Sequence, residues 1–191
     1  MNTDLSTREL ARYSRHLSLP DFGVTGQLKL KNVKVLIIGA GGLGVPLLQY
    51  LAAAGIGTIG IIDFDRIEIS NLQRQVLYDT NEEGLLKAKI AAQKIQNLNP
   101  EIQVNFYPVL LDRNNIMTIL ENYDIIADGT DNFPTRYLVN DACVLLGKTL
   151  IYGSIFRFEG QVSVFNFLDK NGQYGPNYRD LFPEPPPPNA V

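Results

Sequence analysis

The sequence predicts an α/β fold: a Rossmann-like, doubly wound and mostly parallel sheet with an antiparallel edge and an N-terminal helical segment. Two observations predict this class. Short β-branched runs, which suit buried strands, alternate along the chain with stretches of helical periodicity. In addition, the glycine pattern GxGxxG at residues 39–44 falls between the first of these strands and the helix that follows it.

The expected elements begin with a helix over residues 7–17, which Ser6 or Thr7 can cap and Glu9 can stabilise through its first-turn carboxylate. A short amphipathic piece at 26–31 then leads into the first strand. The expected strands are 33–38, 58–62, 102–107, 125–128, 149–152 and 161–167. The helices between them are a helix starting near 42 and helices over 84–97, 114–121 and 132–146. The last strand alternates apolar and polar residues, which suits an antiparallel edge.

Composition limits the functions that this chain can have. With 191 residues and 45% hydrophobic content, the chain can build one domain with its own core. The net charge of −3 argues against a nucleic-acid binder. Residues 35–62 carry no charge, but their clustered glycines and Pro46 argue against a membrane-spanning helix. The single cysteine, Cys143, excludes an internal disulfide, so a cytoplasmic protein is expected.

The glycine turn is the first feature that points to a ligand. Without a Cβ at these glycines, phosphate oxygens can approach the backbone N–H groups at the start of a helix. Asp63 follows the next strand, 19 residues after Gly44, where a carboxylate can accept hydrogen bonds from ribose hydroxyls. Taken alone, these residues favour an NAD(P)-dependent oxidoreductase. The structural alternative is a glycine turn that packs a helix against a strand and binds no ligand.

Further charged residues favour a nucleoside triphosphate instead. Arg74, in the segment SNLQRQ, and Lys87, at the start of the next helix, come soon after Asp63. A triphosphate needs more positive charge than one helix terminus supplies. Asp131 follows another apolar strand, at a strand end where a carboxylate can hold Mg²⁺. The alternatives are a solvated surface for the two cations, and a helix N-cap for Asp131 or Asn132.

Several motifs together carry a resemblance to a known family. They are RYSRH at residues 12–16, GAGGLG at 39–44, DFD at 63–65, SNLQRQ at 70–75, a lysine shortly after Gly84, and TDN at 130–132. With these motifs, residues 12–188 resemble the ThiF/MoeB/HesA family, the bacterial relatives of ubiquitin-activating enzymes. The combination of SNLQRQ with RYSRH argues for this family rather than for a dehydrogenase.

The resemblance implies adenylation of a small β-grasp, ubiquitin-like carrier protein that ends in Gly-Gly. The terminal carboxylate of the carrier would attack the α-phosphorus of ATP, release pyrophosphate and leave an acyl-adenylate. In the family, the arginine that matches Arg15 reaches the ATP of the opposite subunit, which implies a homodimer. Molybdopterin, thiamin, cysteine and siderophore pathways use closely similar activators, so the carrier itself stays open.

The resemblance also implies roles for individual residues. Asn71, Arg74 and Lys87 would contact the phosphates. Asp63 would hold the ribose, and Asp131 would bind Mg²⁺. The full set expected to lie against the nucleotide is Gly39, Gly41, Gly42, Gly44, Asp63, Asp65, Ser70, Asn71, Leu72, Gln73, Arg74, Lys87, Asp131 and Asn132.

The chain departs from the family near its end. The family commonly has a CxxC pair, half of a structural zinc site, where this chain has Asn177 and Asp180, so structural Zn²⁺ is not expected. The family's closing segment would follow Val191, so a truncated or shortened chain is expected. A non-catalytic nucleotide-binding relative is therefore an alternative to the active enzyme.

From these observations we divide the chain into three parts. They are an N-terminal helical arm (1–31), a nucleotide-binding core (32–168) and an extended, proline-rich tail (169–191). An exposed apolar edge is expected beside Phe165 and Phe167. Cys143 is expected to be a small buried hydrophobic residue with no covalent role in catalysis.

Overall fold

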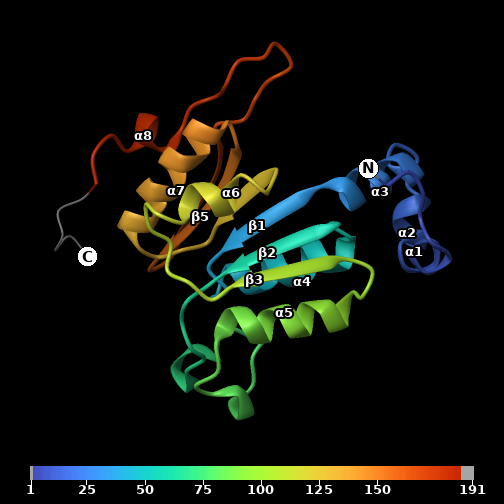
Figure 1. Ribbon diagram of the computed structural model, residues 1–191, viewed down its shortest axis with the longest axis horizontal. Helices are drawn as coiled ribbons and strands as arrows, with labels where there is room; N and C mark the ends of the chain where they lie inside the picture. The colour runs from blue at the N-terminus through green and yellow to red at the C-terminus, as the bar shows by residue number, and fades with distance from the viewer. Residues whose placement is uncertain (1, 186–191) are drawn as a thin grey trace.

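The structure is a computed structural model that describes residues 2–185. A six-stranded sheet with the strand order β3-β2-β1-β4-β5-β6 forms its centre (Figure 1). The strands are β1 (Lys34–Ile38), β2 (Thr58–Ile62), β3 (Gln103–Tyr107), β4 (Ile125–Asp128), β5 (Thr149–Phe156) and β6 (Glu159–Phe165). Strands β1 to β5 run parallel, and β6 pairs antiparallel with β5 at the edge. The predicted fold class is thereby confirmed.

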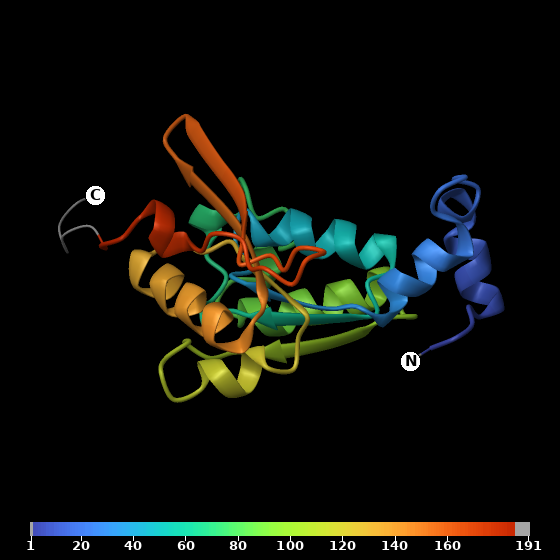
Figure 2. The same ribbon diagram turned by 90° about the horizontal axis from the view of Figure 1, so that it is seen from above.

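Helices cover both faces of the sheet. On β1, Val35 and Ile37 face a core shared with α4 and α5, whereas Leu36 and Ile38 face a second core shared with α6 and α7. Figure 2 shows α4 on one side of the sheet and α6 with α7 on the other. The helices are α1 (Thr7–Arg12), α2 (Ser14–Leu17), α3 (Gly23–Asn32), α4 (Gly44–Ala54), α5 (Lys87–Leu98), α6 (Ile116–Leu120), α7 (Phe133–Leu146) and α8 (Tyr178–Leu181). Two 3₁₀ helices, η1 (Ile69–Asn71) and η2 (Thr80–Glu82), lie between β2 and α5.

Most element boundaries lie close to the predicted ones. β2 and β4 have the expected bounds, because their apolar β-branched runs end at polar residues. α5 begins three residues later than expected, since Gly84 has a φ of +80° and its N–H bonds the Ile67 carbonyl instead of continuing a helix. β5 is longer than expected and reaches Phe156, because its second half pairs with β6. α3 is longer than predicted at both ends, and α6 is shorter.

The prediction of one continuous helix over 7–17 was wrong. The chain breaks at Tyr13, although Ser6 and Glu9 form the expected N-terminal capping box. Tyr13 is buried, and its hydroxyl accepts a 2.8 Å hydrogen bond from Asn99 Nδ2. Its ring lies against Gly55, where an added Cβ would stand 2.5 Å from the ring. A long-range contact therefore overrides the local helical pattern.

The prediction of an extended tail from residue 169 was also wrong for the described part. Leu168 pairs with Tyr174, and α8 follows at 178–181. Tyr178 is buried among aromatic rings, which include Tyr152 and Phe165 at 5.2 and 5.8 Å between ring centroids. The burial of this aromatic side chain holds the segment against α7. The polyproline stretch from 186 onward lies outside the described residues.

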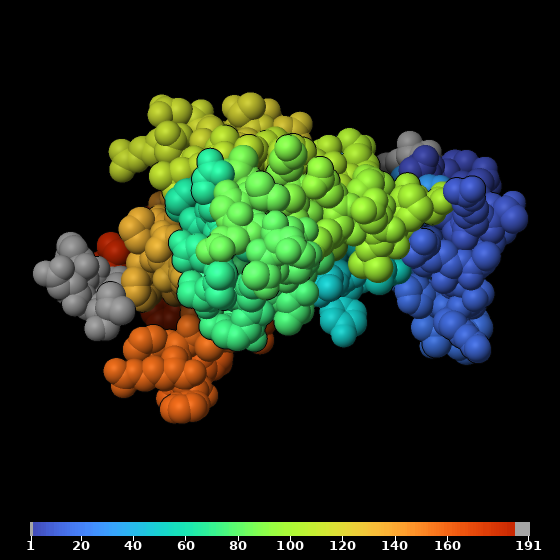
Figure 3. Space-filling view, turned by 90° about the horizontal axis from the view of Figure 1, so that it is seen from below, coloured from blue at the N-terminus to red at the C-terminus, as the bar shows by residue number. Residues whose placement is uncertain are grey.

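The β5–β6 hairpin stands away from the rest of the molecule (Figures 2 and 3). Its exposed apolar side chains are Ile155, Phe156, Phe158, Val162 and Val164. Phe167 is exposed as expected, but Phe165 is buried, because it points from the edge strand into the core around α7. Within residues 2–185, every helix is too short or too polar to cross a bilayer.

Candidate active site

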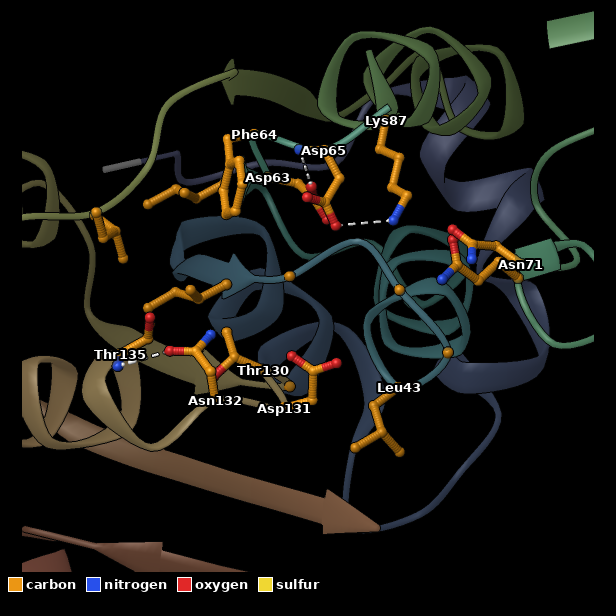
Figure 4. Close-up of a pocket in the computed structure, with 18 of the residues that line it drawn as sticks. Leu43, Asp63, Phe64, Asp65, Asn71, Lys87, Thr130, Asp131, Asn132 and Thr135 are labelled. Atoms are coloured by element: carbon orange, nitrogen blue, oxygen red, sulfur yellow. Dashed lines mark hydrogen bonds and ion pairs between the residues drawn. The ribbon is translucent and has the colours of Figure 1, made fainter. Parts of the chain in front are cut away.

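A pocket with a volume of about 690 Å³ opens beyond the carboxyl ends of β1, β2 and β4 (Figure 4). Its floor is the glycine turn between β1 and α4, and the loops after β2 and β4 form its sides. The carboxyl ends of parallel strands are the usual location of ligand sites in open α/β sheets. Ten of the residues expected at the nucleotide line this pocket: Gly39, Gly41, Gly42, Asp63, Asp65, Asn71, Arg74, Lys87, Asp131 and Asn132.

The glycines of the turn have different tasks. Gly39 has a φ of +88°, which a residue with a side chain rarely adopts. Gly44 does not line the pocket; an added Cβ there would stand 1.8 Å from the Gly39 carbonyl oxygen, so Gly44 lets α4 lie against the turn. At Gly42 an added Cβ would meet only the Arg74 side chain, at 3.5 Å. Gly42 therefore keeps the pocket floor open.

Asp63 joins the loop after β2 to the glycine turn. It is 8% exposed, and its Oδ2 accepts a hydrogen bond from the Ala40 N–H at 2.8 Å. Its Oδ1 accepts one from the Asp65 N–H, also at 2.8 Å. Burial raises the pKa of Asp63, while the two backbone N–H groups and the nearby Lys87 act in the opposite direction. Each carboxylate oxygen keeps a second lone pair for a ligand hydroxyl.

Lys87 is a buried cation, whereas Lys89 on the same helix is exposed. The Lys87 Nζ lies 3.1 Å from Asp65 Oδ2, and its backbone N–H donates to the Asp65 carbonyl at 3.0 Å (Figure 4). These contacts hold the first turn of α5 against the loop after β2. The solvated-surface alternative therefore applies to Lys89 and not to Lys87.

Only part of the SNLQRQ segment lines the pocket. Asn71 and Arg74 do so, and Arg74 is exposed, with its Nη1 3.4 Å from the Ser70 carbonyl. Ser70, Leu72 and Gln73 were expected at the nucleotide and do not line the pocket. The Ser70 hydroxyl donates to Glu68, Leu72 packs against the core under α4 and α5, and Gln73 donates back to the Ser70 carbonyl.

The loop after β4 carries Asp131 into the pocket. Asp128, at the end of the strand, is 2% exposed, and its Oδ1 accepts hydrogen bonds from the Thr130 N–H at 2.9 Å and the Thr130 hydroxyl at 2.7 Å. Burial raises the pKa of Asp128. Asn132 caps α7 by accepting from the Thr135 N–H at 2.9 Å. Asp131 is exposed, and its carboxylate has no hydrogen-bond or ion-pair partner among residues 2–185.

Several lining residues were not expected from the sequence. Phe64, Val109, Leu110 and Ile155 form an apolar wall of the pocket. Phe64 is the middle residue of the DFD motif, whereas the other three belong to no motif that the sequence singles out. Gln75 is buried below Gly41, and the sequence signal for it was its place at the end of SNLQRQ. The others are Arg66, Glu68, Leu111, Gly129, Thr130, Thr135 and Arg136, together with the strand ends Ile38 and Ile62 and with Leu43 of the turn.

Arg15 lies far from this pocket. It belongs to α2, in an arm that contacts the opposite ends of α4 and α5. There, Gln27 Nε2 donates to the Ala54 carbonyl at 2.9 Å, and Arg12 Nη1 donates to the Leu98 carbonyl at 3.1 Å. Figure 1 shows α1 and α2 at the end of the sheet where β1 begins. Arg15 therefore does not reach the pocket of its own chain.

Two further sequence expectations concern Cys143 and the positions of the zinc pair. Cys143 is fully buried on α7, and burial raises the pKa of its thiol to about 12. Asn177 and Asp180 form a capping box at the start of α8. Among the residues that the structure describes, no three His, Cys, Asp or Glu side chains gather as metal ligands would.

Comparison with known protein families matches residues 13–191 to the ThiF family. The chain belongs to the ThiF family. Among ThiF-type relatives, it is 55% identical to a sulfur carrier protein adenylyltransferase of Thermus thermophilus, over 96% of this chain and 68% of the relative. It is 58% identical to a probable adenylyltransferase/sulfurtransferase MoeZ of Mycobacterium tuberculosis, over 98% of this chain and 47% of the relative.

The fold is shared with solved structures. A crystal structure of Escherichia coli MccB with ATP superposes with a TM-score of 0.67 and 33% identity, over 75% of this chain and 44% of MccB. The ThiF-family chain thus spans between 40% and 68% of the length of the curated relatives it matches.

Proposed function

We propose that this chain catalyses the ATP-dependent adenylation of the C-terminal carboxylate of a small ubiquitin-like sulfur-carrier protein ending in Gly-Gly. The observation that carries the proposal is the convergence of Arg74, Lys87 and Asp131 on one pocket above the glycine turn. The printed names of the relatives support the same reaction, since they are adenylyltransferases, one of them for a sulfur carrier protein.

The pocket offers different chemistry along its length. In Figure 4, Phe64 and Asn71 lie on opposite sides of Asp63 and Asp65. The apolar wall of Phe64, Val109 and Leu110 suits a purine base, and the adjacent Asp63 suits its ribose. The glycine turn and the cations beyond it suit the triphosphate, because backbone N–H groups and positive side chains both bind phosphate oxygens.

Asp131 fits a magnesium ion. Mg²⁺ is commonly held by one or two carboxylates together with substrate phosphate oxygens, and the exposed Asp131 carboxylate is not engaged elsewhere within residues 2–185. When bound, the ion neutralises charge on the phosphates.

The residues of the chain position the reactants and stabilise charge. The carrier carboxylate attacks the α-phosphorus, a new bond forms from its oxygen to phosphorus, and the bond to the pyrophosphate oxygen breaks. Pyrophosphate leaves with the electron pair, and the product is an acyl-adenylate. Arg74 and Lys87 stabilise the negative charge that accumulates on the departing pyrophosphate. The reaction needs no protein nucleophile, which agrees with the burial of Cys143.

We also propose a homodimer in which Arg15 completes the pocket of the opposite subunit. The support is its position on α2, away from its own pocket, together with the family resemblance. Coexpression of an Arg15→Ala chain with a Lys87→Ala chain tests it. Each variant alone is expected to be inactive, and the mixed dimer regains one intact site. Two inactive variants that stay inactive when coexpressed would contradict this arrangement.

The proposed reaction is tested by carrier-dependent exchange of labelled pyrophosphate into ATP. Exchange is expected to require Mg²⁺ and a carrier with its terminal Gly-Gly, and to be lost when the last glycine is deleted. Arg74→Ala and Lys87→Ala are expected to abolish exchange, and Lys89→Ala, on the exposed side of α5, is the matched control.

Two results would favour other functions. ATP binding without any exchange would indicate a non-catalytic nucleotide-binding relative. A rise in the thermal unfolding midpoint with NAD but not with ATP and Mg²⁺ would indicate an oxidoreductase.

A further inference from the structure

Arg136 is a buried cation that the proposed reaction has not used. It lies in the first turn and a half of α7, is 7% exposed and lines the pocket. No carboxylate of residues 2–185 lies within ion-pair distance of its guanidinium. Lys87, the comparable buried cation across the pocket, is paired with Asp65 at 3.1 Å. A buried charge is unfavourable without compensating contacts, so the contacts that Arg136 does make must offset the cost of burying its guanidinium.

Those contacts converge on the loop that carries Asp131. Arg136 Nη2 donates to the Thr130 carbonyl at 2.9 Å, and its Nε donates to the same oxygen at 3.3 Å. Nη2 also donates to Ser154 Oγ on β5 at 3.1 Å. The guanidinium carbon stands 5.2 Å from the ring centroid of Phe133 and 5.5 Å from that of Tyr152. The planar group is therefore fixed in one orientation.

Thr130 is held from its other side by Asp128. The Asp128 carboxylate accepts from the Thr130 N–H and from its hydroxyl, so each polar group of Thr130 has a buried partner. The Thr130 carbonyl belongs to the same peptide plane as the Asp131 N–H. Fixing that plane limits the directions in which the Asp131 side chain can leave the backbone. In Figure 4 its carboxylate points toward the glycine turn.

We propose that Arg136, together with Asp128, is a positioning residue that holds Asp131 ready to bind the metal–phosphate group. This inference rests on the proposed function. Its physical basis is that a charge-assisted, two-point bond to a backbone carbonyl restrains a loop more strongly than a neutral bond does. A ligand that is already oriented loses less conformational entropy on binding.

The test compares ATP affinity with and without Mg²⁺. Isothermal titration gives the dissociation constant of ATP in EDTA and in Mg²⁺ for the wild type and for Arg136→Gln. Mg²⁺ is expected to tighten ATP binding by the wild type. In Arg136→Gln this gain is expected to shrink by about tenfold, whereas the constant in EDTA stays within about twofold, because the glycine turn, Arg74 and Lys87 are untouched.

Two further variants separate positioning from general stability. Arg136→Lys retains the charge but can make fewer of the bonds, so an intermediate gain is expected; it also serves if Arg136→Gln does not fold. Arg179→Gln is the matched control, because Arg179 binds α7 through Asp141 at 2.7 Å and does not line the pocket. It is expected to keep the wild-type gain.

The outcomes are distinguishable. The positioning role would be overturned if Mg²⁺ tightened ATP binding equally in wild type, Arg136→Gln and Arg136→Lys. It would also be overturned if Arg136→Gln lost as much ATP affinity in EDTA as it loses in Mg²⁺. Absence of carrier-dependent pyrophosphate exchange in a wild type that shows the Mg²⁺ gain would instead overturn the proposed reaction and leave the positioning role standing.

Discussion

Two loops flank the glycine turn, one after β2 and one after β4, and a buried aspartate stands where each begins: Asp63 directly follows β2, and Asp128 is the last residue of β4. Asp63 and Asp128 both accept a hydrogen bond from the N–H group two residues later, at 2.8 and 2.9 Å. Each buried aspartate is followed along the chain by a second carboxylate and then a cation that line the pocket. These are Asp65 and Lys87 after β2, and Asp131 and Arg136 after β4.

The anchoring of the two loops differs. The second oxygen of Asp63 accepts from the Ala40 N–H across the glycine turn, whereas the second oxygen of Asp128 is buried without a partner among the described residues. Lys87 forms an ion pair with Asp65, whereas Arg136 donates to the Thr130 carbonyl and forms no ion pair with Asp131 or any other carboxylate of residues 2–185. The same local turn therefore fixes the pocket wall after β2, whereas after β4 it presents a carboxylate, that of Asp131, with no partner among the residues that the structure describes. Four experiments can break or sharpen this comparison.

The largest effect is expected from Gly44→Ala, because both loops rest on the turn that this residue supports. Its Cβ would stand 1.8 Å from the Gly39 carbonyl oxygen, so backbone must shift. We expect the free energy of unfolding to fall by roughly 3 kcal/mol or more, measured by urea denaturation. Gly42→Ala is the control: its Cβ makes an ordinary 3.5 Å contact, so stability should change by less than about 1 kcal/mol while ATP affinity falls. Equal stability of the two variants would contradict the assigned roles.

Asp131→Asn and Asp65→Asn test which carboxylate serves the ligand. For Asp131→Asn we expect pyrophosphate exchange to fall by about 100-fold or more, with little change in stability, because its carboxylate has no partner to lose among residues 2–185. The Asp65 side chain is half exposed, so its ion pair with Lys87 is worth about 1 kcal/mol or less. Exchange by Asp65→Asn should therefore fall by less than about tenfold. A reversed order would show that the loop after β2 holds the critical carboxylate.

The buried aspartates are compared by Asp63→Asn and Asp128→Asn. Asp63 uses each oxygen for a different N–H group, so an amide leaves one of them facing an NH₂ group, at a cost of about 1–3 kcal/mol. Asp128 uses one oxygen for both bonds to Thr130, which an amide oxygen can replace, at less than about 1 kcal/mol. Unfolding in urea at pH 7 measures both changes. A larger loss for Asp128→Asn would refute the difference in anchoring.

The smallest expected effect is the change with pH in the difference between the unfolding free energies of the wild type and Asp128→Asn. Burial raises the pKa of Asp128 in the folded chain, so its contribution to stability is complete below the unfolded pKa of about 3.9 and is lost as the pH rises through the folded pKa. The free energy of unfolding of the wild type should therefore decrease relative to that of Asp128→Asn from pH 4 upward. A series of urea midpoints at increasing pH checks the sign, and a relative increase would contradict it.

The sequence predicted what local pattern determines. β2 and β4 were bounded correctly because their apolar runs end in polar residues, and the residues that follow them converge as the parallel sheet requires. The break at Tyr13 could not be predicted, since it depends on Asn99, which lies 86 positions away. The position of α8 likewise could not be predicted, since it depends on the packing of Tyr178 against Tyr152 of β5 and Phe165 of β6.

The site was predicted in the same uneven way. Charged residues that the sequence motifs singled out, such as Arg74 and Lys87, line the pocket. Arg136 also lines it but was not singled out, because its partner is the backbone carbonyl of Thr130, which any residue type would offer. Leu72 and Gln73 were also expected at the nucleotide because they adjoin Asn71 and Arg74 in sequence. They do not line the pocket: Leu72 packs against the core, and Gln73 donates to the Ser70 carbonyl.

The lone thiol of α7 supplies a built-in reporter for one half of the sheet. Cys143 has no exposed surface, and burial raises the pKa of its thiol so that it stays protonated at neutral pH. An alkylating reagent therefore cannot react with it while α7 is packed against the sheet. The labelling rate then follows how often α7 separates from β4 and β5. Comparing that rate with and without nucleotide would show whether ligand binding tightens the half of the molecule that carries Asp131, with no probe added to the chain.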